Sequence, residues 1–93
     1  MRAGGNMLTK KVIVQNEHGL HARVAMHVAE TSKGAQATVT VCRGCKRADG
    51  CSVLQLLMLE AEQGSEIELL ISGGNEEQCL RNIAAIFNNG SGI

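Results

Sequence analysis

Only one aromatic side chain, Phe87, occurs in this chain of 93 residues. A core without large rings has to be filled by Val, Ile, Leu, Ala and Met, whose small volumes favour thin layers over a deep centre. The length is that of one domain, and a domain of this size still buries over half of the surface of its unfolded chain. We therefore expect a single sheet covered by helices.

The charges are balanced, with nine basic and nine acidic side chains and no basic run. Nucleic-acid binding usually needs a basic surface and aromatic rings for stacking, so we expect no nucleic-acid partner. The apolar stretches fall far short of the roughly 20 residues that span a bilayer, and no signal peptide is visible. These features favour a soluble, cytoplasmic monomer without membrane insertion.

The two ends of the chain lack hydrophobic periodicity. Residues 1–6 are Gly-rich and precede a second methionine, Met7, which suggests a leader outside the fold. Residues 89–93 have the composition of a flexible tail. We expect residues 7–88 to form the domain.

Alternating hydrophobicity predicts four strands. They cover 8–15, 37–42, 66–72 and a short segment near 45–48, which follows a turn at Gly44.

Helical spacing predicts three helices. The first covers 22–33 and ends with Gly34 at its C′ position; the second is short and begins after Ser52 as its N-cap. The third follows Asn75 as its N-cap. Its apolar stripe consists of Leu80, Ile83, Ala84 and Phe87. The order of elements, βαββαβα, favours an α+β fold with a four-stranded antiparallel sheet and three helices on one face.

An imidazole stands where the first helix begins, in Gly19-Leu20-His21-Ala22-Arg23. His21 is not among the usual N-cap residues, so the backbone N–H groups of Ala22, Arg23 and Val24 lack an obvious acceptor. An anion could bind there, held by the helix dipole and the Arg23 guanidinium, and a neutral ring nitrogen could attack phosphorus.

Other interpretations of the histidines stay open. A histidine in a loop beside an arginine is often only a solvated polar residue. His18 is the closest rival as a nucleophile, and His27 is expected on the surface of the first helix.

The segment from Asn16 to Ala25, Asn-Glu-His-Gly-Leu-His-Ala-Arg-Val-Ala, resembles the active-centre motif of the HPr family. Its members are histidine-containing phosphocarriers of the bacterial phosphoenolpyruvate-dependent sugar phosphotransferase system. The resemblance continues from Met7 to Phe87 and implies the family's open-faced β-sandwich fold.

The resemblance implies a phosphoryl carrier, which is not an enzyme and needs no cofactor or metal. His21 would accept a phosphoryl group on Nδ1 from phosphorylated enzyme I and pass it to enzyme IIA domains, with Arg23 stabilising the phosphate. One departure concerns Val24, which stands where the family usually has Pro. Proline in a first helical turn presets φ and lacks an N–H, so the geometry of the active centre is affected.

Ser52 matches the regulatory serine that HPr kinase/phosphorylase modifies in many Gram-positive relatives. The alternative is a simple N-cap. Several apolar residues near Ser52 exceed what one face of a short helix can bury, which predicts an exposed surface for docking enzyme I and enzyme IIA domains. We expect that surface to contain Leu20, Val53, Leu54 and Leu57, with Leu56 directed inward.

Four cysteines, Cys42, Cys45, Cys51 and Cys79, could form a metal or redox site. No second C-x-x-C motif is present, so we expect Cys42 and Cys45 to face each other across the hairpin as thiols.

Three functions remain to be separated. The first is the phosphocarrier. The second is a regulatory module of the same fold, which belongs to a nitrogen-type phosphorelay or docks a transcriptional regulator through Ser52 and the apolar residues beside it. The third is a metal-binding or redox-active domain.

Overall fold

A computed structural model describes residues 7–88; the predicted leader, residues 1–6, and the predicted tail, residues 89–93, lie outside this range. Within it the elements follow the predicted order. They are β1 (Met7–Ile13), α1 (Ala22–Gly34), β2 (Ala37–Arg43), β3 (Lys46–Asp49), α2 (Val53–Met58), β4 (Glu66–Gly73) and α3 (Glu76–Asn88).

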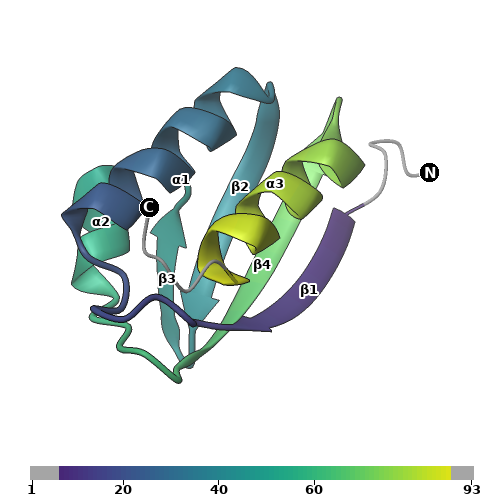
Figure 1. The fold of residues 1–93 in the computed structure, drawn as a ribbon. Helices are drawn as coiled ribbons and strands as arrows, with labels where there is room; N and C mark the ends of the chain where they lie inside the picture. The colour runs from purple at the N-terminus through teal and green to yellow at the C-terminus, as the bar shows by residue number, and fades with distance from the viewer. Residues whose placement is uncertain (1–6, 89–93) are drawn as a thin grey trace.

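The strands form one antiparallel sheet in the order β1-β4-β2-β3. Helices α1 and α3 cross one face of this sheet, and α2 packs beside α1 and β3 (Figure 1). The start of α1 lies beside α2, at the opposite end of the molecule from the start of α3 (Figure 1). The predicted open-faced, two-layer architecture is confirmed.

The core lies between the sheet and the helices. Alternate residues of β2 and β4 point into it; the buried Val12 of β1 pairs with Ile67, and Val41 pairs with both Leu69 and Ala48. Phe87 on α3 is fully buried, as expected of the one large ring available. The apolar stripe of α3 differs in part from the prediction: Cys79 and Ile86 are buried with it, whereas Leu80 packs only partly against the core.

Two local predictions are wrong. Gly34 is the last residue of α1, its C-cap Ala35 is right-handed, and the left-handed residue is Gln36, at φ 57°. The chain therefore leaves the helix later than the glycine suggested. Cys42 pairs across the hairpin with Arg47, while Cys45 lies exposed in the turn, so the two thiols do not face each other.

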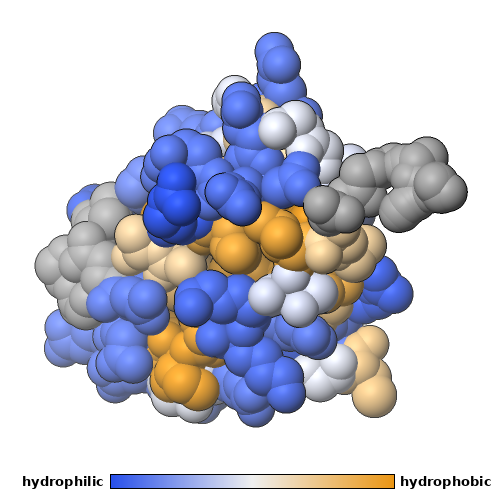
Figure 2. All heavy atoms as spheres, turned by 90° about the vertical axis from the view of Figure 1, so that its right-hand side faces the viewer, coloured by the Kyte–Doolittle hydropathy of each residue, from blue (hydrophilic) through white to orange (hydrophobic). Residues whose placement is uncertain are grey.

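The free edge of β1 carries two exposed apolar side chains, Met7 and Ile13. Seen from the right-hand side of Figure 1, hydrophobic atoms gather between hydrophilic ones (Figure 2).

None of the helices within residues 7–88 has the length and hydrophobicity needed to cross a membrane.

Candidate functional site

His21 is the N-cap of α1, as its position in the sequence predicted. Its backbone is extended, and its Nδ1 accepts a hydrogen bond of 3.2 Å from the backbone N–H of Arg23. An accepting Nδ1 carries a lone pair, so the neutral ring in this arrangement holds its proton on Nε2. The lone pair of His21 is thus directed at the first turn of α1.

The loop before His21 is held by hydrogen bonds on both sides. Gly19 N–H donates to the Asn16 carbonyl and Leu20 N–H donates to the Ala61 carbonyl, each at 2.9 Å. Gly19 has φ 71°, and a Cβ there would lie 2.5 Å from the Ala61 oxygen, so glycine is required both by conformation and by space.

Asn16 ties the same loop to the end of α3. Its side chain is completely buried, and Nδ2 donates to the Ile86 carbonyl at 3.1 Å. The sequence analysis named Asn16 only as the first residue of the motif that resembles the HPr active centre, with no anchoring role. The available signal was a polar residue directly after a predicted strand. The residue that it contacts, Ile86, is 70 positions further along the chain.

A second imidazole lies next to His21. The ring of His18 is 6.1 Å from that of His21 between centroids, with 71° between their planes, which is an edge-to-face arrangement. His18 is exposed in the turn before Gly19. His27, expected on the surface, is instead half-buried, and its Nδ1 is buried with no hydrogen-bond partner among residues 7–88.

The start of α1 is suited to an anion. The first N–H groups of a helix lack intrahelical acceptors, and the dipole makes this end positive. No acidic residue occurs in the first turn of α1, while Arg23 is exposed there. Val24, which replaces the proline usual in the resembling family, is completely buried and belongs to the core.

The predicted docking residues are only partly exposed. Leu56 is fully buried, as expected, and Leu54 is 69% exposed. Val53 and Leu57 pack partly against the core. Leu20 was placed on the docking surface incorrectly: it is 5% exposed and belongs to the hydrophobic core, and its backbone N–H is bonded to the Ala61 carbonyl.

Two methionines that the sequence analysis did not select are exposed instead. Met58 on α2 is 64% exposed and Met26 on α1 is 51% exposed. Together with Leu54 they are called the apolar surface below. The exposure of Met58 could not be read from hydrophobicity alone, because α2 has less than two turns in which to define a buried face.

Ser52 is the N-cap of α2, as predicted. Its Oγ accepts a hydrogen bond of 3.2 Å from the backbone N–H of Gln55. Asp49 lies just before it: its carboxylate accepts from the N–H of Cys51 at 2.9 Å, and its carbonyl accepts from the N–H of Ser52. A phosphate on Ser52 would meet the positive end of α2 and the negative charge of Asp49 together.

The cysteines are all free thiols. Burial raises the pKa of the Cys79 thiol, and the charge of Cys51 raises it further. Within residues 7–88 no group of three or more His, Cys, Asp or Glu side chains is placed to hold a metal ion.

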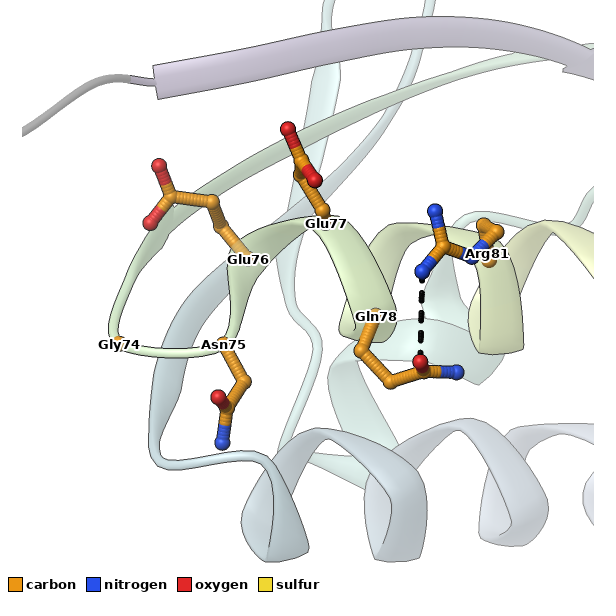
Figure 3. Close-up of a pocket in the computed structure, with 6 residues that line it drawn as sticks. All are labelled: Gly74, Asn75, Glu76, Glu77, Gln78 and Arg81. Carbon is orange, nitrogen blue, oxygen red and sulfur yellow. Dashed lines mark hydrogen bonds between the residues drawn. The ribbon is translucent and has the colours of Figure 1, made fainter.

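A separate pocket opens at the start of α3, lined by Gly74, Asn75, Glu76, Glu77, Gln78 and Arg81. Figure 3 shows the guanidinium of Arg81 turned to the side-chain oxygen of Gln78, a hydrogen bond of 3.3 Å. The two carboxylates disfavour an anion here, and the pocket lies at the other end of the molecule from the start of α1.

The fold and the site together define a class: a small open-faced β-sandwich protein that presents an imidazole at the positive end of its first helix. Comparison with known proteins identifies the family. The family model described as the PTS HPr component phosphorylation site matches residues 8–89. The chain belongs to the HPr family of phosphocarrier proteins, whose members carry phosphate between proteins and do not themselves catalyse a reaction.

Relatives of both HPr and NPr type match most of the chain. Phosphocarrier protein NPr of Proteus mirabilis is 37% identical over 83 residues, which cover 87% of this chain and 91% of the relative. Phosphocarrier protein NPr of Escherichia coli strain K12 is 36% identical, covering 90% and 96%. Phosphocarrier protein HPr of Neisseria meningitidis serogroup A is 32% identical, covering 88% and 92%.

Solved structures agree with the fold. The phosphocarrier protein HPr of Bacillus anthracis superposes with a TM-score of 0.83 at 26% identity, covering 87% of this chain and 96% of that one. HPr of Thermoanaerobacter tengcongensis gives a TM-score of 0.85 at 22% identity, covering 92% and 97%, and supports the fold alone.

Proposed function

We propose that His21 is the phosphoryl acceptor and donor of this phosphocarrier, and that the group is carried on Nδ1. One observation supports this most strongly: the Nδ1 lone pair of His21 is directed at the first turn of α1, where Arg23 N–H already donates to it. A phosphoryl group on Nδ1 would bring its oxygens to those same N–H groups.

The transfer is a simple displacement. The Nδ1 lone pair forms a bond to phosphorus, the bond between phosphorus and the leaving atom of the donor breaks, and that atom keeps the electron pair. The Nε2 proton of His21 is released to solvent, which keeps the phosphorylated ring neutral, and the leaving atom of the donor takes up a proton from solvent. Arg23 and the α1 N-terminus balance the charge of the phosphoryl oxygens.

The partners we propose are enzyme I as donor and enzyme IIA domains as acceptors, in the cytoplasm. The apolar surface of Met26, Leu54 and Met58 supports this assignment, since α2 packs against α1 and the helix that begins at His21 continues to Met26. Long, flexible methionine side chains suit a surface that meets several partners in turn. Rapid, weak docking needs no tight aromatic anchor.

The test is phosphorylation with purified enzyme I and phosphoenolpyruvate. We expect the chain to gain one acid-labile, base-stable phosphoryl group and to pass it to an enzyme IIA domain. His21→Ala should abolish the gain, while His27→Gln, on the same helix, should retain it. Equal labelling of His21→Ala and the unchanged chain would refute the assignment.

A second candidate is service in a nitrogen-regulatory phosphorelay in place of sugar uptake. Relatives named NPr match at 36–39% identity and those named HPr at 29–32%, which favours keeping this candidate. The two are separated by offering the phosphorylated chain equal amounts of a sugar-specific and a nitrogen-type enzyme IIA domain. Faster phosphorylation of the nitrogen-type domain would support this candidate. Faster phosphorylation of the sugar-specific domain would reject it.

We also propose Ser52 as a regulatory phosphorylation site for an HPr kinase/phosphorylase, with a transcriptional regulator as the partner that reads it. Its place at the start of α2, two residues before the exposed Leu54, supports this. Ser52→Asp should change the affinity for such a partner, with Ser52→Ala as control. Unmodified Ser52 after incubation with the kinase and ATP would reject this proposal.

A further inference from the structure

A second histidine stands beside the proposed acceptor, and the family assignment gives it no role. The rings of His18 and His21 lie edge to face with centroids 6.1 Å apart. We propose that His18 is a positioning residue, which donates a ring N–H to the phosphoryl group on His21 and, when protonated, adds a positive charge beside it. This inference rests on the proposed function of His21.

The loop holds His18 in place through its backbone. Two residues before it, Asn16 is anchored in the core through Ile86, and one residue after it, Gly19 donates to the Asn16 carbonyl. His18 therefore lies inside a closed turn and does not depend on a long, mobile side chain to reach its neighbour. A short side chain on a fixed backbone loses less conformational freedom on forming a hydrogen bond than a long, mobile one does.

A phosphoryl group extends the reach of His21 beyond its ring. It adds three acceptor oxygens beyond the ring, and the separation of 6.1 Å between the ring centroids is short enough for such an oxygen to bridge the two side chains. Arg23 contributes its charge from α1, so His18 and Arg23 approach the group from the loop and from the helix.

Acidic and basic residues both lie near this pair, so a second positive charge would stabilise the phosphoryl group further. Glu17 precedes His18 in the turn, and Glu62 approaches Gly19 through its backbone. A carboxylate beside the turn repels a phosphoryl dianion, and Arg23 opposes it from α1. A ring N–H of His18, on the loop side of the phosphoryl group, would add a second donor against this repulsion.

The experiment compares equilibrium constants for phosphoryl transfer from phosphorylated enzyme I to the full chain and to His18→Gln. We expect the unchanged chain to be favoured roughly threefold, the size typical of an exposed charge pair. His18→Lys, with a permanent charge, should keep this advantage.

Controls separate this inference from the function it rests on. His27→Gln removes a histidine from α1 and should leave the equilibrium constant unchanged, and circular dichroism should show each variant folded. Equal equilibrium constants for the unchanged chain and His18→Gln would overturn the role of His18 while leaving His21 as acceptor. No phosphorylation of the unchanged chain would instead overturn the proposed function.

Discussion

Replacing Gly19 by alanine should destabilise the loop that holds His21. The new Cβ would lie 2.5 Å from the Ala61 oxygen and 2.9 Å from the Glu62 Cα, both backbone atoms that cannot rotate away. The loop therefore has to move apart from residues 61–62, and the hydrogen bond from Leu20 N–H to the Ala61 carbonyl, 2.9 Å long, has to lengthen or break.

The magnitude can be worked out in two parts. A left-handed alanine at φ 71° costs about 1 kcal/mol in conformational energy. Loss of the Leu20 hydrogen bond next to a buried side chain adds about 1–3 kcal/mol, because a buried donor left without its acceptor keeps its desolvation cost. We expect a total loss of about 3 kcal/mol in the free energy of unfolding.

Gly44→Ala is the matched control. Gly44 has φ 61°, but a Cβ there meets nothing within 4 Å, so only the conformational cost of about 1 kcal/mol applies. Equilibrium urea unfolding of both variants measures the difference, expected to be about 2 kcal/mol. Equal destabilisation of the two variants would show that the contact with residues 61–62 does not hold the loop.

Further predictions concern α2 and the buried thiol. Ser52→Ala should lower the free energy of unfolding by about 1 kcal/mol through loss of the N-cap, measured by urea unfolding; no change would contradict that cap. Leu56→Ala should cost about 2–5 kcal/mol, whereas Leu54→Ala should cost under about 0.5 kcal/mol yet slow phosphoryl transfer. Because burial raises the pKa of the Cys79 thiol, the unfolded chain loses this proton before the folded chain does as the pH rises. The free energy of unfolding should therefore fall in alkali, and it should fall less in Cys79→Ala. Urea unfolding at a series of alkaline pH values measures both.

Much of the fold followed from local patterns in the sequence. Alternation in 37–42 and 66–72 predicted β2 and β4, because a strand with one buried face repeats every two residues. The end of α1 could not be predicted in this way. Gly34 was expected to be the left-handed residue that ends the helix, but that residue is Gln36. Helix ends depend on how the next strand joins the sheet, which local sequence does not specify.

The candidate site was predictable where it is local and not where it depends on distant contacts. The N-cap position of His21 follows from the five-residue motif around it, and the structure places it so. The burial of Leu20 and the anchoring of Asn16 depend on residues 61 and 86, far along the chain. The error at Leu20 arose because an apolar residue beside a site fits a docking surface and a core equally well.

The most direct test of the account is NMR of the chain carrying ¹⁵N-labelled histidine, before and after phosphorylation by enzyme I. We predict that the Nδ1 resonance of His21 acquires coupling to phosphorus, while the Nε2 resonance of His21 and both nitrogens of His18 do not. Coupling at Nε2 of His21, or at either nitrogen of His18, would contradict the central claim that the lone pair directed at the start of α1 receives the phosphoryl group.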